Sequence, residues 1–153
     1  MSAILLHNIR SAYNVGSIFR TADAAGISKI FLSGYTPRPV DSLGRMQKEI
    51  AKTALGAEKT IIWTYSKHPL TAFDVAREEG MSVVGIEQDK RAIDYRSYKN
   101  TGSTLFVVGN EVRGMSPSLR NTCDVLLEIP MHGRKESLNV SVAVGIILFA
   151  CRR

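Results

Sequence analysis

The sequence has few of the features that mark secreted, metal-binding or membrane proteins. Its two cysteines, Cys123 and Cys151, lie in apolar surroundings without metal-ligand spacing, so we expect small buried thiols in a reducing compartment. Every apolar run is shorter than the roughly 18 residues that suggest a membrane-spanning helix, and the chain opens without a leader pattern. We therefore expect a cytoplasmic protein with no membrane segment.

Further absences narrow the possible functions. The three histidines have no partners at the spacing of a metal site, so no metal is expected. No GxGxxG motif follows the first apolar run with an acidic residue about 20 positions later, which argues against a nucleotide-binding dehydrogenase. Internal repeats and low-complexity segments are also absent. A length of 153 residues with 44% hydrophobic residues fits about one globular domain.

Positive charge is in excess along the chain. Twenty Lys and Arg residues against 14 Asp and Glu residues give a formal net charge of +6. This excess favours a polyanionic partner such as nucleic acid, and a soluble basic domain is the simpler alternative.

Strand and helix patterns alternate along the whole sequence. Continuous apolar strands separated by helices predict an α/β fold with a mainly parallel sheet flanked by helices on both faces. Residues 33–45 are expected to form a basic loop, and residues 87–102 are polar without clear periodicity. Strands are predicted at 3–6, 29–32, 60–65, 81–86, 103–108 and 124–129, and helices at 14–25, 46–55, 69–79, from 116, and from 138 to the C-terminus.

The C-terminal stretch places a polar turn between an apolar strand and an apolar helix. Pro130 ends the strand, because proline cannot donate a hydrogen bond to a neighbouring strand. Either Ser137 or Asn139 is suited to cap the helix that follows. Apolar residues lie on more than one face of this helix, which predicts a buried or interface helix.

Polar motifs follow three of the predicted strands, where ligands gather in parallel sheets. They are NVGSIFR at 14–20, GNEVRG at 109–114 and the turn before the last helix. Each has an ordinary explanation when taken alone. Asn14 and Ser137 are suited to cap helices, Arg20 to be a surface cation, and Glu111 to pair with Arg113 in solvent.

Together, the motifs NxGxxxR, VVGNExxG and IPMxGxxxSLNVSVAxG resemble the SpoU (TrmH) branch of the SPOUT RNA methyltransferases. The resemblance extends from Leu6 to the C-terminus. It implies an α/β fold with a C-terminal deep trefoil knot, a homodimer, S-adenosylmethionine bound in the knot, and methylation of ribose 2′-hydroxyls in tRNA or rRNA. It also implies a single domain over residues 1–153, since no additional substrate-binding domain such as many relatives carry is evident.

The resemblance also implies site residues at matching positions. The implied catalytic residues are Arg20, Asn14, Glu111, Ser137 and Asn139. The positions implied to hold the cofactor, largely through backbone groups, are Ile86, Gly109, Ile129, Met131, Ser137 and Leu138.

The role of Arg20 is open from sequence. An arginine is protonated near neutral pH, so we favour an electrostatic role, in which Arg20 binds a phosphate and stabilises negative charge on the hydroxyl oxygen, over a role as base. The apolar C-terminal helix is the expected dimer face. A non-catalytic RNA-binding module on the same scaffold is the alternative function. The cations expected to meet RNA are Arg10, Arg38, Arg45, Lys48, Arg113, Arg134 and Lys135.

Overall fold

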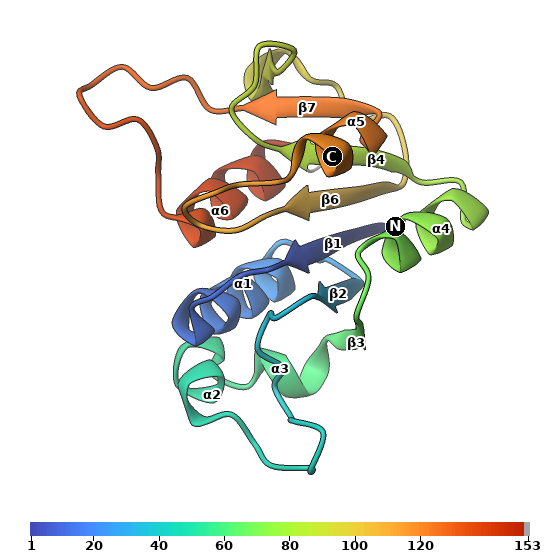
Figure 1. Cartoon of the computed structure of the whole chain (residues 1–153), viewed down its shortest axis with the longest axis vertical. Helices are drawn as coiled ribbons and strands as arrows, with labels where there is room; N and C mark the ends of the chain where they lie inside the picture. Colours follow the sequence, from blue (N-terminus) through green and yellow to red (C-terminus); the bar gives the residue numbers. More distant parts are fainter. Residues whose placement is uncertain (152–153) are drawn as a thin grey trace.

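A sheet of seven parallel strands forms the centre of the structure, a computed structural model that describes residues 1–151 (Figure 1). The spatial order of the strands is β3-β2-β1-β6-β4-β7-β5, so several neighbours in the sheet are far apart in the chain. In chain order the strands are β1 (Ser2–His7), β2 (Lys29–Ser33), β3 (Ile62–Ser66), β4 (Ser82–Ile86), β5 (Ile93–Asp94), β6 (Thr104–Val108) and β7 (Val125–Glu128).

Helices cover both faces of the sheet. One face packs against α1, α2 and α6, and the other packs against α4 and α5. The helices are α1 (Ala12–Ala24), α2 (Lys48–Ala54), α3 (Ala57–Thr60), α4 (Leu70–Glu78), α5 (Pro117–Thr122) and α6 (Val140–Ala150), with a short 3-10 helix at Tyr95–Ser97. The predicted α/β fold with a parallel sheet is therefore confirmed.

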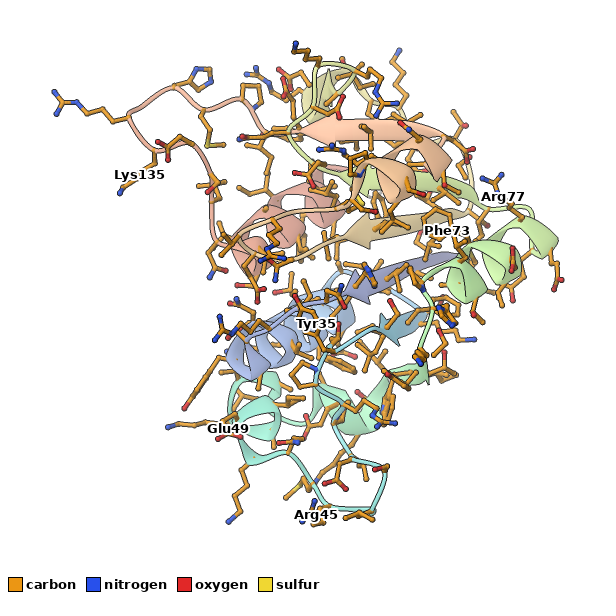
Figure 2. All side chains as sticks on the ribbon, in the orientation of Figure 1. Tyr35, Arg45, Glu49, Phe73, Arg77 and Lys135 are labelled. Atoms are coloured by element: carbon orange, nitrogen blue, oxygen red, sulfur yellow. The ribbon has the colours of Figure 1, made fainter. Side chains whose placement is uncertain are left out.

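Strand β1 shows how the sequence builds two cores. Successive side chains of a strand point to opposite faces, so Ile4 and Leu6 join the cluster around Phe19 of α1. Leu5 joins the cluster around Phe73 of α4, which is labelled in Figure 2. These side chains are at most 1% exposed, and burying each one contributes about 1.5–3 kcal/mol relative to leaving it in water.

The third predicted strand needs a correction. The strand was expected at 60–65, but β3 spans Ile62–Ser66 and Thr60 ends the unpredicted helix α3. Gly56, expected to stop the preceding helix, has φ of 98° and leads directly into this single turn, where Ala57 is buried. A four-residue helix is too short to show a periodic pattern.

Two shorter elements were also missed. The polar stretch 87–102 contains β5 and the 3-10 helix, which have two and three residues. Strand β5 pairs with the end of β7, so its formation depends on a partner about 34 residues away in the chain rather than on its own pattern.

The helix starts near the motifs also differ slightly from the prediction. Helix α1 begins at Ala12 rather than Asn14, with Ser11 as its N-cap accepting a hydrogen bond from the Asn14 backbone N–H. Helix α6 begins at Val140, and of the two suggested caps it is Asn139 that accepts from the Ser141 backbone N–H. The Asn14 side chain is therefore available for tertiary contacts.

The arrowheads of β1, β6 and β7 point to the same side of the molecule, and the loop of residues 129–139 projects from that side (Figure 1). This edge brings together the turns that follow the strands. Within residues 1–151, no helix is long and apolar enough to cross a membrane.

Candidate functional site

Residues of the second and third sequence motifs line a cavity of about 450 Å³ beyond the carboxyl ends of β4, β6 and β7, here called the strand-end cavity. Its wall contains backbone and side chains from the turns after these strands and from the start of α6. All the positions proposed to hold a cofactor line it: Ile86, Gly109, Ile129, Met131, Ser137 and Leu138. Glu111, proposed as catalytic, lies in the same wall.

The turn after β6 gives the cavity one rigid side. Asn110 and Gly114 form an antiparallel bridge, and the Gly114 N–H donates to the Asn110 carbonyl at 2.9 Å. A Cβ at Gly109 would lie 2.7 Å from the backbone carbon of Gly114 and from the backbone nitrogen of Met115. Only glycine therefore lets the turn fold back on itself. The Met115 N–H donates to Oε2 of Glu87 at 2.7 Å, which ties the turn to the end of β4.

The lining of the strand-end cavity is acidic. Four carboxylates contribute to the wall, and none of the described lining residues is Lys, Arg or His. The carboxylates belong to Glu87, Glu111, Glu128 and Glu136. Such a lining favours a ligand with positive charge.

Three of these carboxylates were missed from sequence. Glu87 directly follows β4, Glu128 ends β7, and Glu136 lies in the loop before α6. Glu87 and Glu128 lie at the carboxyl ends of strands, where ligands bind in parallel sheets. This rule could have identified them from the sequence.

Glu111 connects the turn after β6 to the start of α1. Its Oε2 accepts from the Arg10 backbone N–H at 2.9 Å, and its Oε1 accepts from the Ser11 N–H at 3.0 Å and from Nδ2 of Asn14 at 3.3 Å. Partial burial pushes the pKa of Glu111 upward, but these donors outweigh burial and hold the pKa below its ordinary value. Both oxygens of the carboxylate are thus engaged by α1 instead of by the Arg113 side chain.

Asn14 joins the first sequence block to the third. Its Oδ1 accepts from Nδ2 of Asn139 at 3.1 Å. The Oδ1 of Asn139 in turn accepts from the Ser141 N–H at 2.9 Å and from the Ser141 hydroxyl at 2.6 Å. A continuous chain of hydrogen bonds therefore runs from Glu111 through Asn14 to the start of α6.

Ser137 lines the strand-end cavity and is exposed, as are most residues of the loop around it. Lys135 lies in the same loop, far from the sheet (Figure 2). The loop contributes one wall of the cavity and at the same time extends cations into solvent.

Arg20 does not join this cluster within one chain. It is exposed and lines a separate hollow of about 500 Å³ with Lys52 of α2 and Phe149 of α6. Arg20 follows Asn14 by six residues, which corresponds to about 9 Å along a helix and about a third of a turn around it. The NxGxxxR motif therefore sends its two polar side chains to different surfaces.

A second hollow of about 920 Å³ adjoins the strand-end cavity and shares Asn110, Glu111 and Val112 with it. We call it the Tyr35 hollow. Its other lining residues are Arg10, Ser11, Asn14, Tyr35 and Arg113.

Two of the cations expected to meet RNA have partners in the chain. The Arg38 guanidinium lies 4.2 Å from the centre of the Tyr65 ring, and Nε of Arg45 lies 2.9 Å from Oδ2 of Asp41. Arg10 and Arg113 instead border the Tyr35 hollow. Of these four arginines, two therefore have partners in their own chain and two lie beside the candidate site.

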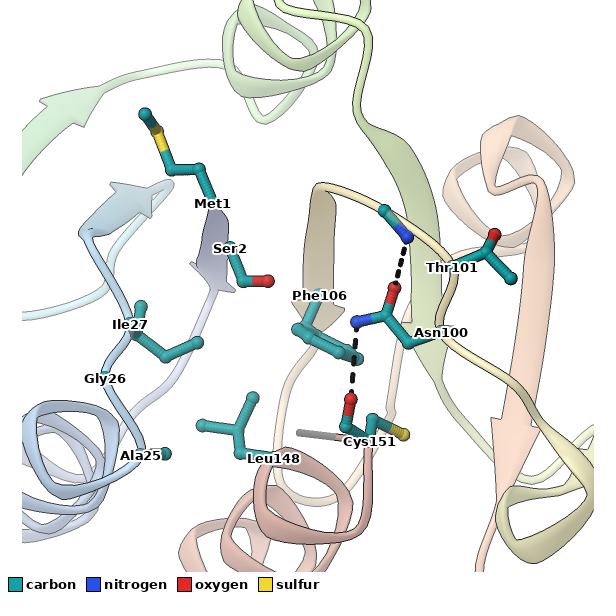
Figure 3. A pocket seen from close by; sticks show the side chains of 11 residues that line it. Met1, Ser2, Ala25, Gly26, Ile27, Asn100, Thr101, Phe106, Leu148 and Cys151 are labelled. Atoms are coloured by element: carbon teal, nitrogen blue, oxygen red, sulfur yellow. Dashed lines mark hydrogen bonds between the residues drawn. The ribbon is translucent and has the colours of Figure 1, made fainter. Parts of the chain in front are cut away.

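A further cavity, of about 620 Å³, lies at the opposite edge of the sheet, beside Ser2, Phe106 and Cys151 (Figure 3). Asn100 there donates to the Cys151 carbonyl at 3.4 Å and accepts from the Gly102 N–H at 3.2 Å. Burial raises the pKa of the Cys151 thiol, which makes it a poor nucleophile. The candidate chemistry therefore lies at the carboxyl edge. No group of three or more His, Cys, Asp or Glu in residues 1–151 is arranged to hold a metal ion.

The parallel sheet and the acidic cavity beyond its carboxyl ends define an α/β protein with a candidate ligand site at the sheet edge. The model of the SpoU rRNA Methylase family matches residues 1–149, and the chain belongs to this family. The resemblance drawn from the three sequence blocks is confirmed.

Known relatives align with nearly the whole chain. It is 35% identical over 150 residues to the 23S rRNA (guanosine-2'-O-)-methyltransferase RlmB of Vibrio vulnificus, covering 98% of this chain and 58% of that protein. It is 31% identical to the tRNA (guanosine(18)-2'-O)-methyltransferase of Aquifex aeolicus, covering 98% and 68%. An AdoMet-bound rRNA methyltransferase from Sinorhizobium meliloti has a TM-score of 0.86 at 30% identity, covering 99% and 55%. The chain spans little more than half the length of the first and third of these relatives.

Proposed function

We propose that this chain carries the catalytic domain of an S-adenosyl-L-methionine-dependent methyltransferase that modifies ribose 2′-hydroxyls of tRNA or rRNA. The observation that carries the proposal is the strand-end cavity, where the second and third sequence blocks supply its wall and four carboxylates line it. The named activities of the relatives support the substrate class. We further propose that residues 1–153 work as one domain, without a separate substrate-binding domain among them, and that the protein is cytoplasmic, where its RNA substrates would be.

The cavity fits this cofactor in size and charge. Its volume of about 450 Å³ lies in the range of small-molecule sites, about 300–1,000 Å³. S-adenosylmethionine supplies a methyl group on a positively charged sulfur, which suits a wall with four carboxylates and no described cation. Backbone groups of Ile86, Gly109, Ile129 and Leu138 would hold the nucleoside part, with Met131 and Ser137 beside it.

The reaction would be an in-line displacement: the ribose oxygen would bond to the methyl carbon, the sulfur would keep the electron pair of the broken bond, and the hydroxyl proton would pass to a water molecule. The chain must hold the two reacting atoms about 3–3.5 Å apart, which is worth up to about 7–11 kcal/mol of the barrier. Asn14 and Asn139 are hydrogen-bonded to each other at the starts of α1 and α6. Asn14 lines the Tyr35 hollow and donates to Glu111, which lies in the wall that both hollows share. We assign these residues to positioning the ribose.

Arg20 is proposed to act from a partner chain. In its own chain it lies beside Phe149, an exposed apolar residue of α6, and away from the strand-end cavity. A two-fold contact through α6 would bring each Arg20 near the partner. There it would bind a phosphate and stabilise negative charge on the hydroxyl oxygen.

Gly109 provides the test of cofactor binding. Gly109→Ala is expected to weaken S-adenosylmethionine binding about tenfold or more, because a Cβ there collides with the backbone of Gly114 and Met115 and shifts the wall, and 1.4 kcal/mol is enough for a factor of ten. Isothermal titration calorimetry measures this. Gly102→Ala is the matched control, since a Cβ at Gly102 meets nothing within 4 Å.

Calorimetry also separates the two functions considered. If the wild-type protein binds RNA but gives no heat with S-adenosylmethionine, it is an RNA-binding module and the methyltransferase proposal is wrong. Equal affinities in the Gly109 and Gly102 variants would show that the cofactor binds elsewhere.

A homodimer through α6 is part of the proposal. Val144, Ile147 and Leu148 of this helix are buried, whereas Val142 is 49% and Phe149 is 53% exposed. We expect light scattering to give a dimer at micromolar concentration and Phe149→Lys to give a monomer, because the new cation would lose its water at the interface near Arg20 and Lys52. Leu70→Lys, at a residue 49% exposed on α4, is expected to remain dimeric. A monomeric wild-type protein would contradict this contact.

We also propose that the C-terminal segment forms the deep trefoil knot implied by the family resemblance. Supporting it, α6 leaves the 129–139 loop and packs against α1, β4 and the 3-10 helix, all from earlier parts of the chain. The Cys151 carbonyl then accepts from Asn100, which precedes β6. Knots are rare among folds, so this topology rests on the family more than on general rules.

A further inference from the structure

Tyr35 is an exposed aromatic residue at the candidate site that no sequence motif identified. It follows β2 and Gly34, is 58% exposed, and lines the Tyr35 hollow of about 920 Å³. This hollow shares the wall of Glu111 and Val112 with the strand-end cavity. Only this shared wall therefore separates the Tyr35 hollow from the cavity proposed to hold the methyl donor. Figure 2 labels the residue.

Tyr35 is held by one hydrogen bond to its side chain and one from its backbone. Its hydroxyl oxygen accepts from Nδ2 of Asn110 at 3.0 Å, and its backbone N–H donates to Oδ1 of Asn8 at 3.1 Å. Nδ2 of Asn110 also donates to the Asn8 carbonyl at 3.2 Å. Tyr35, Asn8 and Asn110 thus form one cluster built from the ends of β1, β2 and β6.

The turn beneath the ring is closely fitted. Asn8 has φ of 55° and Gly34 has φ of 65°, so both lie in the left-handed region, which asparagine and glycine adopt more readily than other residues. A Cβ at Gly34 would overlap Oδ1 of Asn8, so the two residues are fitted to each other. A rigid exposed ring loses little conformational freedom when a ligand stacks on it.

Charge changes sign across the shared wall. The strand-end cavity has four carboxylates and no described cation, whereas the Tyr35 hollow has Arg10 and Arg113 on its border. The hollow has one carboxylate, Glu111, whose oxygens accept hydrogen bonds from α1. A positively charged ligand suits one side, and an anion with a flat apolar part suits the other.

We propose that Tyr35 stacks on the base of the nucleotide to be methylated, with Arg10 and Arg113 binding its flanking phosphates. This rests on the proposed function and adds a residue that positions the target nucleotide. The base would lie on the ring, the phosphates at the arginines, and the ribose at the wall of Glu111 and Asn14, facing the methyl donor. Unstacked RNA bases bind aromatic faces in this way, and phosphates fix the register.

The test compares Tyr35→Ala, Tyr35→Leu and Tyr35→Phe. The substrate is total RNA from cells lacking the gene for this protein, and methyl incorporation from labelled S-adenosylmethionine is measured. Tyr35→Ala is expected to raise the KM for RNA about tenfold, because stacking is worth about 1–3 kcal/mol per base. Tyr35→Leu keeps a large apolar side chain, so the variant is expected to fold. It lacks the aromatic face, so its KM for RNA is also expected to rise. Tyr35→Phe keeps the ring and is expected to stay near the wild-type KM.

Two controls make the outcome specific. Cofactor affinity by calorimetry is expected to stay at the wild-type value in all three variants. Tyr13→Ala removes a ring that is 48% exposed on α1 outside the hollow and is expected to leave the KM unchanged. An unchanged KM in both Tyr35→Ala and Tyr35→Leu would overturn the stacking role, as would a Tyr35→Phe variant as impaired as Tyr35→Ala, which would make the hydroxyl contact with Asn110 the important feature. No methyl incorporation by the wild-type protein would instead overturn the proposed function, and the stacking role with it.

Discussion

Arg20→Ala is expected to lower turnover about 100- to 1,000-fold, the usual loss when one group that stabilises transition-state charge is removed. The affinity for S-adenosylmethionine is expected to stay unchanged, because Arg20 lies outside the strand-end cavity. Arg20→Lys should retain part of the activity, because it keeps the positive charge but loses the bidentate hydrogen bonding of a guanidinium to phosphate. Single-turnover rates and calorimetry on the same preparations measure both quantities. Lost cofactor binding in Arg20→Ala would contradict the electrostatic role.

A mixed dimer tests whether Arg20 serves the partner's site. A chain with Arg20→Ala and a chain with Asn139→Ala, carrying different affinity tags, are purified together as a heterodimer. If Arg20 acts across the interface, one of the two sites in the heterodimer is intact and about half the wild-type activity returns. If Arg20 acts in its own chain, both sites are defective. An inactive heterodimer would therefore place the reaction within a single chain.

Glu111→Ala is expected to destabilise the protein by about 1.5–3 kcal/mol at neutral pH, the cost of losing hydrogen bonds to a charged group. The carboxylate is the acceptor for the Arg10 and Ser11 N–H groups at the positive end of α1. The variant should also turn over slowly, because Asn14 loses its anchor to the turn after β6. Urea denaturation at pH 7 measures the stability. Glu78→Gln, at an exposed carboxylate on α4, is the control and is expected to match the wild type.

The contribution of Glu111 should depend on pH with a definite sign. Its pKa in the folded protein lies below the ordinary value of 4.5, so the folded state favours the ionised carboxylate. The stabilisation is fully present above the ordinary pKa and is lost as the pH falls through the folded pKa. The difference in unfolding free energy between the wild type and Glu111→Gln should therefore be constant at neutral pH and shrink as the pH falls below 4.5. A difference that stays constant at the lower pH as well would show that the hydrogen bonds do not depend on the charge.

The sequence by itself determined much of the fold and, through the family resemblance, several of the residues that line the candidate site. Continuous apolar strands such as Thr104–Val108 and the glycines that end helices have local physical causes, so the α/β fold followed from pattern alone. Gly109, Ile129, Met131, Ser137 and Leu138 were expected at the cofactor site and line the strand-end cavity, whereas Asn139 is not among its lining residues. Elements too short for a pattern, such as Ala57–Thr60 and Ile93–Asp94, could not be found this way.

Only the tertiary structure decided which turns became neighbours. Strand β6 lies between β1 and β4, and β7 lies next to β4, so Glu87 and Glu128 share one wall although 40 residues separate them. Tyr35 acquires its contact with Asn110 for the same reason. Asn14 and Arg20 are close in sequence but face different surfaces, because the helix rotates each successive side chain. The periodicity of the sequence indicates which residues are buried, but the order of the strands depends on contacts between distant parts of the chain. That order brings the acidic residues of the cavity together.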